Sequence, residues 1–227
     1  MIIPIKGVFS KEEVAQFRAH LDSAPWQDGR LSAGSQAQSQ KQNSQLNVDS
    51  LVARKLSDKI LSVLARQPTF VSAALPLKIL PPMFNRYGSG DGYGFHVDNA
   101  VRIVPGSSIR IRTDLSATIF FSEPEQYEGG ELEIESSCGN QLIKLGAGDM
   151  ILYPSTSLHR VRPVCKGQRF ASFFWIQSMI RDHEQRQILF DLDQSVQSLT
   201  IQHGHDHTDV VRLSAAYHRL IRQLADT

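Results

Sequence analysis

Residues 141–178 read QLIKLGAGDMILYPSTSLHRVRPVCKGQRFASFFWIQS, and this stretch decides the fold class. Short runs rich in β-branched and aromatic residues follow one another, separated by glycine, proline and polar residues. The same pattern of short β-rich runs begins at residue 71 and includes LKILPPMFNRY, GFHVDN, RIRTDLSATIFFS and GELEIE. Short strands at regular spacing with turn signals between them are typical of a sandwich or barrel. No strand–helix–strand alternation is visible, which argues against a Rossmann-type fold.

Helices are expected before this β-rich region. Ser10 and Glu13 have the spacing of a capping box, and the apolar residues that follow at helical spacing are Val14, Phe17 and Leu21. A second helix is predicted over 49–66, where an apolar stripe is followed by Pro68. Between them, residues 32–45 are rich in serine and glutamine. This segment is interpreted either as a surface loop or as a lid over a nearby site.

The tail, residues 180–227, returns to a helical pattern. Two apolar stripes predict two helices, joined by the segment HGHDHTD at 203–209. His203, His205, Asp206 and His207 offer a transition metal several ligands. The interpretation we favour is a solvated inter-helix loop in which Asp and Thr cap a helix.

Composition excludes several classes of protein. Hydrophobic residues make up 41% of the 227 residues and charged residues 21%, which is typical of globular domains. The net charge of +1 gives no electrostatic case for nucleic-acid binding. The chain has no apolar run of the ~18 residues that a membrane helix needs, and its start, MIIPIKGVF, does not resemble a signal peptide. Cys138 and Cys165 form no CxxC pair, so we expect inert cysteines and a cytoplasmic location.

The motif that carries chemistry is Gly94-Phe95-His96-Val97-Asp98. On a strand, side chains two residues apart point to the same face, so His96 and Asp98 would present an imidazole and a carboxylate together. His159 offers a third ligand. Two histidines and one carboxylate form the facial triad of non-haem Fe(II) oxygenases, which leaves coordination positions open for a co-substrate and O₂. Alone, the HxD pattern also fits a hydrogen-bonded histidine and a turn aspartate.

Four further residues are candidates for the same site. Arg169 follows His159 by ten residues in an otherwise apolar strand, and its guanidinium suits a carboxylate such as the distal one of 2-oxoglutarate. Tyr87 and Tyr93 can donate to a co-substrate carboxylate or act as core tyrosines. Trp175 lies on the same face as Arg169 if the strand is regular; we interpret it as core packing, with a pocket role as the alternative. The glycine turns at 129–130 and 146–148 are interpreted as structural.

The order H-x-D, GGEL, GDMILYPS, LH and then Arg resembles the Fe(II)/2-oxoglutarate dioxygenase superfamily, and more closely its prolyl-4-hydroxylase-like branch. The stretches WQDGRLSAG, FNRY, RTDLSATIFFSEPE, SLHRVRPV and ASFFW resemble the bacterial PKHD-type hydroxylases across essentially the whole chain. The resemblance implies a mainly β fold with flanking helices, a double-stranded β-helix (jelly roll). It implies a dioxygenase domain over 1–179, with its jelly-roll core at about 71–178 and its catalytic region at about 78–178. A small C-terminal helical domain of the PKHD type would occupy 180–227.

Carried over by position, the resemblance implies that His96, Asp98 and His159 are the metal ligands and that Arg169 anchors 2-oxoglutarate. Tyr87 and Tyr93 match the tyrosines near the co-substrate less closely. The implied activity is a 2-oxoglutarate-dependent hydroxylase that uses Fe(II), 2-oxoglutarate, O₂ and L-ascorbate and releases succinate and CO₂. The substrate would be a peptidyl proline or a small molecule of iron uptake.

Two other classes of function stay open at this point. A non-catalytic sensor of iron and 2-oxoglutarate would share the fold but often lacks a ligand or the arginine. A cupin-like metalloprotein would usually supply more histidine ligands and would leave Arg169 without a role. The apolar stripes of the C-terminal helices allow packing on the core or a homodimer. We expect neither nucleic-acid nor membrane partners.

Overall fold

The computed structural model describes residues 1–32, 40–136 and 139–226, and its centre is a pair of antiparallel β-sheets. The eight-stranded sheet runs in the order β1 (Ile3–Ile5), β14 (Met150–Pro154), β10 (Leu115–Phe120), β17 (Arg169–Ser178), β6 (Met83–Tyr87), β4 (Ser44–Leu46) and β2 (Trp26–Asp28), with β5 (Pro76–Ile79) beside β17. The five-stranded sheet runs in the order β13 (Gln141–Ile143), β12 (Leu132–Ile134), β15 (His159–Val161), β7 (Gly92–His96) and β3 (Lys41–Gln42). The predicted sandwich of short strands is therefore confirmed.

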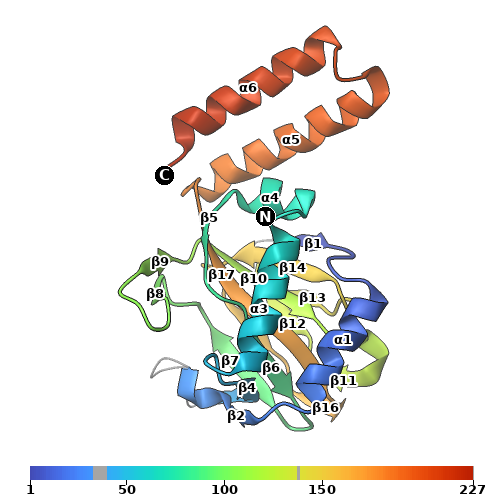
Figure 1. The fold of residues 1–227 in the computed structure, drawn as a ribbon, viewed down its shortest axis with the longest axis vertical. Helices are drawn as coiled ribbons and strands as arrows, with labels where there is room; N and C mark the ends of the chain where they lie inside the picture. The colour runs from blue at the N-terminus through green and yellow to red at the C-terminus, as the bar shows by residue number, and fades with distance from the viewer. Residues whose placement is uncertain (33–39, 137–138, 227) are drawn as a thin grey trace.

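Two ribbons and several helices surround the sheets. The ribbons are β8 (Val101–Ile103) with β9 (Arg110–Arg112), and β11 (Tyr127–Gly129) with β16 (Val164–Gly167). The α-helices are α1 (Lys11–Asp22), α3 (Leu51–Leu64), α4 (Pro68–Ala74), α5 (His183–His203) and α6 (Thr208–Leu224), and the 3₁₀ turns are η1 (Gly29–Ser32) and η2 (Pro124–Gln126). Helices α1 and α3 cover one face of the larger sheet (Figure 1).

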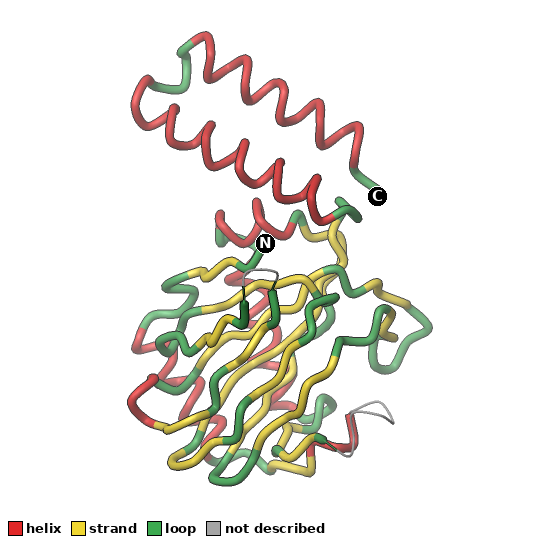
Figure 2. Tube along the Cα trace, turned by 180° about the vertical axis from the view of Figure 1, so that it is seen from behind, coloured by secondary structure: helices red, strands yellow, loops and turns green. Residues whose placement is uncertain are grey.

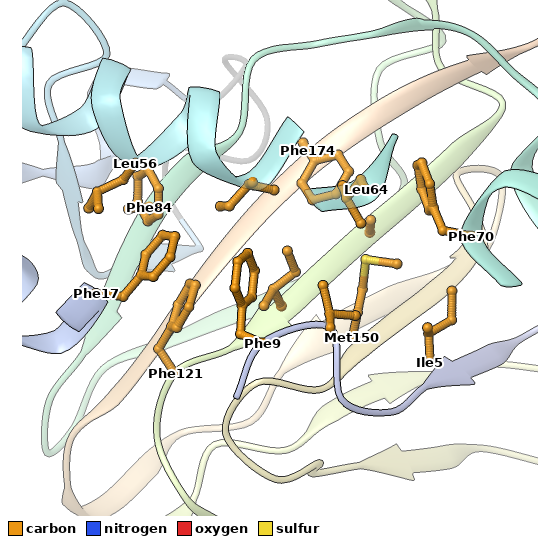
Figure 3. Close-up of a cluster of buried hydrophobic side chains, with 14 of the residues drawn as sticks. Ile5, Phe9, Phe17, Leu56, Leu64, Phe70, Phe84, Phe121, Met150 and Phe174 are labelled. Atoms are coloured by element: carbon orange, nitrogen blue, oxygen red, sulfur yellow. The ribbon is translucent and has the colours of Figure 1, made fainter. Parts of the chain in front are cut away.

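The alternation of side chains along β10 separates the two cores. Leu115, Ala117 and Ile119 point toward the helices and join the cluster that also holds Phe17 and Leu64. Figure 3 shows this cluster, with side chains of α1 and α3 lying on those of the sheet. The intervening residues face the smaller sheet: Ser116, Thr118 and Phe120. Each buried apolar side chain contributes about 1.5–3 kcal/mol to the free energy of folding, so the helix-covered face stabilises the sheet. The other face carries polar side chains and is available for a site.

Local sequence signals explain the helix ends. The side chain of Ser10 accepts a hydrogen bond from the Glu13 amide and the Glu13 carboxylate accepts one from the Ser10 amide, so the capping box is confirmed. Helix α3 begins after Ser50 and ends at Leu64, within the predicted 49–66. Pro68 does more than stop that helix, because it is the first residue of α4. Within the region from residue 71, the first strand is therefore β5, which begins at Pro76.

The two predicted C-terminal helices are present as an antiparallel hairpin that stands away from the sandwich (Figures 1 and 2). Its base packs on α4 through a cluster built around Leu75, Ile180 and Leu189. None of the helices in the described part of the chain combines the length and apolarity that crossing a bilayer requires.

Two sequence interpretations differ from the structure, and a third, that the cysteines are inert, stays a prediction. Residues 33–39 of the serine- and glutamine-rich segment lie outside the described residues, but its end is not a loop, because 41–42 and 44–46 form β3 and β4. The cap of α6 is the His207 side chain, which accepts from the Asp209 amide, and not Asp or Thr as expected. Cys138 lies outside the described residues, and Cys165 is a free, exposed thiol.

The glycine turns are structural, as predicted. Gly129 has φ +71° and Gly148 has φ +93°, conformations that side chains rarely adopt. A Cβ atom on either would also collide with a backbone carbonyl, that of Pro163 or Phe9. These turns connect the strands of the sandwich.

Candidate metal centre

Strand pairing brings three potential metal ligands together. His96 ends β7, His159 begins β15, and the two are directly opposite in the ladder. Asp98 lies two residues beyond the end of β7 rather than on it, yet its carboxylate still faces the two imidazoles. Their ligand atoms lie within 4.8 Å of one another, and no other such group of three occurs among the described residues. Two imidazoles and a carboxylate on one side of a point are the donor set of a facial triad.

Hydrogen bonds fix which nitrogen each histidine offers. The Nδ1 atom of His96 is 2.8 Å from the Gly94 carbonyl, and that of His159 is 3.0 Å from the Ser157 carbonyl. A carbonyl oxygen can only accept, so both Nδ1 atoms donate and both Nε2 lone pairs are left free. The His159 Nε2 atom lies 3.8 Å from Asp98 Oδ2. Orientation by a second hydrogen bond of this kind is typical of metal-binding histidines.

The surroundings of His96 keep its imidazole in the neutral form. Burial, followed by the neighbouring His159 ring, lowers the pKa of His96 to about 4. His96 is therefore neutral at neutral pH, which is the form that binds a metal. The Tyr93 ring stacks on the His96 ring with centroids 3.7 Å apart, and the Tyr153 ring meets His159 edge-on at 5.2 Å. These aromatic walls restrict the movement of both imidazoles.

A short hydrogen-bond chain holds the carboxylate. The Ser116 hydroxyl donates to Asp98 Oδ2 at 2.6 Å, and the Ser155 hydroxyl lies 2.7 Å from that of Ser116. Both serines are buried. The sequence analysis missed them, although the polar Ser116 alternating with apolar neighbours in LSATIF was a signal for an inward-facing polar residue.

Arg169 is a buried cation in the same cavity. It begins β17 opposite Tyr87, is 1% exposed, and its guanidinium carbon lies 5.5 Å from the Tyr87 ring and 5.1 Å from the Phe120 ring. No ion pair joins it to a carboxylate within the described ranges, and its Nε atom has no hydrogen-bond partner there. Because an unpaired buried charge is costly, this arginine is suited to an anionic ligand.

The cavity unites the predicted site residues. It lies between the two sheets and is partly open to solvent. Every candidate from the sequence lines it: Tyr87, Tyr93, His96, Asp98, His159, Arg169 and Trp175. Burial raises the pKa of Tyr87 to about 12, so its phenol stays protonated and able to donate. Trp175 is 5% exposed and contacts both the cavity and a small apolar cluster, so neither of its two interpretations excludes the other.

Further lining residues were missed by the sequence analysis. The main ones are Lys41, Asn85, Arg102, Ser116, Thr118 and Tyr153. Of these, Tyr153 had a signal, because it follows Ile151 at strand spacing and both face inward. Lys41 and Arg102 lie on strands of only two and three residues, which are too short for the sequence to show which face each side chain takes.

The donor set and the buried cation fit an iron ion and a keto diacid. Two imidazoles and a carboxylate leave open metal positions, as a chelating ligand requires. Arg169 is a cation in the same cavity that could hold a second, separate anionic group. The segment at 203–207 differs, because its histidines are exposed and only the His203 and His207 rings are in contact, with centroids 4.9 Å apart.

Comparison with known proteins gives two family matches. Residues 82–177 match the 2OG-Fe(II) oxygenase superfamily, and residues 183–226 match the PKHD-type hydroxylase C-terminal domain. A PKHD-type hydroxylase of Methylobacillus flagellatus is 53% identical over all 227 residues, and one of Saccharophagus degradans is 52% identical, each covered in full. The crystal structure of a Pseudomonas putida prolyl-4-hydroxylase is similar in fold, with a TM-score of 0.52 at 15% identity over 78% of this chain and 92% of that one.

Proposed function

The chain belongs to the PKHD-type hydroxylases of the 2OG-Fe(II) oxygenase superfamily, and from this premise we propose which of its residues carry the reaction. The protein is a 2-oxoglutarate- and Fe(II)-dependent hydroxylase with the jelly-roll fold. In the proposed assignment His96, Asp98 and His159 hold Fe(II). Their Nε2 atoms and carboxylate converge within 4.8 Å, which supports this role.

Arg169 holds the distal carboxylate of 2-oxoglutarate in the proposal. The observation that carries it is the burial of this unpaired guanidinium in the cavity of the triad. Tyr87 lies opposite Arg169 and donates from its phenol to the same carboxylate, while Tyr93 packs on His96 and fixes its ring. Trp175 forms part of the substrate wall. A cupin-like metalloprotein would leave Arg169 without an anion, and a sensor would not need all four residues.

When bound, iron and 2-oxoglutarate supply the oxidising power: O₂ is consumed, 2-oxoglutarate becomes succinate and CO₂, and one oxygen atom enters a substrate C–H bond. The protein supplies orientation. The carbonyls of Gly94 and Ser157 fix the imidazoles, and Ser116 fixes the Asp98 carboxylate. The aromatic walls limit the entry of water.

The substrate is proposed to be a peptidyl proline or a small molecule of iron uptake. L-ascorbate would keep the iron reduced between turnovers. We also propose that residues 1–179 form the dioxygenase domain, with the jelly-roll core at about 71–178 and the catalytic region at about 78–178, and that 180–227 form the helical domain. A cytoplasmic location and a homodimer through the C-terminal helices complete the proposal.

An anaerobic titration tests it directly. Fe(II) is added first and 2-oxoglutarate second, and the visible absorbance is recorded. A metal-to-ligand charge-transfer band that requires both additions and disappears in His159→Ala is expected. If folded, iron-loaded protein gives no band with 2-oxoglutarate, the keto acid does not chelate the metal and the proposed roles are wrong.

A further inference from the structure

The cavity contains two cationic side chains that the proposed function does not use. Arg102 lies on β8, and its guanidinium carbon is 4.0 Å from the centre of the Trp175 ring. In the β8–β9 ribbon its partner is the buried Ile111, whereas Val101 and Ile103 on either side are more than half exposed. Arg102 therefore points from the ribbon into the cavity and not toward solvent.

Lys41 reaches the same region from the smaller sheet. It lies on β3 opposite Tyr93 and is only 5% exposed. Its Nζ atom is 5.4 Å from the Tyr93 ring and 5.9 Å from the Phe173 ring, so it extends across to β17 of the larger sheet. Burial, and secondly the charge of Arg102, lowers the pKa of Lys41 to about 8. Both cations are therefore charged at neutral pH and close enough to influence each other.

These cations are separated from the proposed 2-oxoglutarate anchor. Trp175 lies six residues beyond Arg169 on β17, which at about 3.3 Å per residue is roughly 20 Å along the strand. Arg169 contacts Tyr87 and Phe120 at one end of the cavity, and Arg102 contacts Trp175 at the other. One five-carbon diacid held by the metal and by Arg169 cannot also account for Arg102.

The charges in the cavity do not balance without a further anion. Among the described lining residues, Lys41, Arg102 and Arg169 are cations and Asp98 is the single carboxylate. Iron(II) and the 2-oxoglutarate dianion add no net charge. No ion pair joins Arg102 to a carboxylate in the described ranges. Because net charge inside a largely buried cavity is costly, this excess of positive charge favours a negatively charged ligand.

We infer that Lys41 and Arg102 form an oxyanion subsite for the substrate, which therefore carries a carboxylate or phosphate group beside the bond that is hydroxylated. The rings of Tyr93, Phe173 and Trp175 surround the subsite and favour an apolar or ring-shaped body next to that group. This inference rests on the proposed function, since it names the class of molecule that the second end of the cavity takes.

Calorimetry on the full chain tests the inference without turnover. The protein is loaded with Mn(II) and saturating 2-oxoglutarate, and three matched probes are titrated: benzoate, phenyl phosphate and benzamide. A charge-assisted hydrogen bond is worth at least a factor of ten in affinity, so we expect one or both anions to bind at least 10-fold more tightly than benzamide. The two anions distinguish a carboxylate from a phosphate subsite.

Variants test whether Lys41 and Arg102 cause the preference for anionic probes over benzamide. Arg102→Gln and Lys41→Gln should each reduce the preference for the anion over benzamide about 10-fold, while the affinity for 2-oxoglutarate stays within 2-fold. Arg102→Lys keeps the charge and should retain part of the preference. Arg110→Gln is the matched control, because Arg110 is exposed on the outer face of the same ribbon. A purely structural role would lower the melting temperature without changing the anion-to-amide ratio.

Three outcomes would overturn the inference. The first is equal or absent binding of all three probes by the wild-type protein, which needs no variant. The second is an anion preference that survives in both glutamine variants. The third is a loss of 2-oxoglutarate affinity in those variants, which would assign the cations to the co-substrate. If Mn(II) and 2-oxoglutarate themselves fail to bind, the proposed function fails, and anion binding to the metal-free protein still decides the subsite.

Discussion

The two ends of the inner face of β17 are built differently. At the first end, Arg169 is enclosed by Tyr87 and Phe120, all from strands of the larger sheet. At the other end, Trp175 is covered by Arg102 from the β8–β9 ribbon, which projects from the side of the sandwich (Figure 1). A site made by sheet strands is fixed by the fold, whereas one made by a ribbon can change without disturbing it. In the proposed assignment, the co-substrate end is therefore built by the sheet strands themselves and the substrate end by an added ribbon.

Removing a metal ligand should abolish function at both ends. Asp98→Ala or His96→Ala takes one of three convergent ligands from the proposed centre, so no 2-oxoglutarate turnover is expected. Succinate release and bound iron are the measurements. Full turnover with iron retained in either variant would contradict the ligand assignment.

Replacing Arg169 should weaken 2-oxoglutarate binding and leave the end of the cavity at Arg102 unchanged. Arg169→Gln removes a bidentate partner whose charged hydrogen bonds are worth about 1.5–3 kcal/mol each, so the apparent affinity for 2-oxoglutarate should fall roughly 100-fold or more. The metal affinity and the anion-to-amide preference at Arg102 should not change. Measuring all three quantities in Arg169→Gln and in Arg102→Gln tests whether the ends are separate. Equal losses of 2-oxoglutarate affinity in the two variants would mean that they form one site.

The first end could be predicted from sequence, and the second could not. Arg169 stands in an otherwise apolar strand, where a charged side chain is costly unless it binds an anion. The HxD motif and His159 follow the spacing of known oxygenases. Arg102 lies in a three-residue strand between exposed neighbours, so its direction depends on how the ribbon folds back. Lys41 follows a glutamine-rich segment and gains its position only by pairing with β7. The direction of a side chain on such a short strand is set by long-range pairing and leaves little pattern in the local sequence.

The same reasoning applies to the fold. The runs LSATIFF and ASFFWIQS predicted strands because they are short, rich in β-branched and aromatic residues and bounded by turn signals, and the capping box predicted α1. Helix α4 was missed because Pro68 was interpreted only as a stop, although proline also suits the first position of a helix. Strands β3 and β4 were missed because they are only two and three residues long and mostly polar; Leu46 is their one buried apolar residue.

Ser116 lies opposite Trp175 in the ladder of β10 and β17, and its replacement should have a smaller effect. Ser116→Ala removes the 2.6 Å hydrogen bond to Asp98, so Fe(II) affinity should fall about 10- to 100-fold, as is typical when a partner of a metal ligand is lost. The charge-transfer band should also shift, which a loss of stability alone would not cause. Ser116→Thr should restore part of the affinity. Ser172→Ala is a matched control, because its buried hydroxyl bonds the Met83 carbonyl, far from the carboxylate.

The smallest effect is expected at Glu133, which holds the strand of His159 from behind. Its carboxylate is 4% exposed and accepts from Arg160 at 2.8 Å and from Arg162 at 2.7 Å, both on or next to β15. Hydrogen bonds from Arg162 first, then from Asn140 and Arg160, lower the pKa of Glu133 to about 2. A carboxyl whose folded pKa is lowered contributes stability above its ordinary pKa, near 4.5, and loses it as the pH falls toward 2.

Thermal unfolding between pH 7 and pH 3 measures this contribution. Glu133→Gln should melt below the wild type at pH 7, and the two melting temperatures should approach each other as the pH falls below about 4.5. Glu128→Gln is the control, since its pair with Lys166 is 3.7 Å long and both side chains are exposed, so it should follow the wild type at every pH. A constant difference between Glu133→Gln and wild type down to pH 3 would show that the loss comes from packing. In that case charge at Glu133 would not hold β15, and the placement of His159 would depend on the sheet alone.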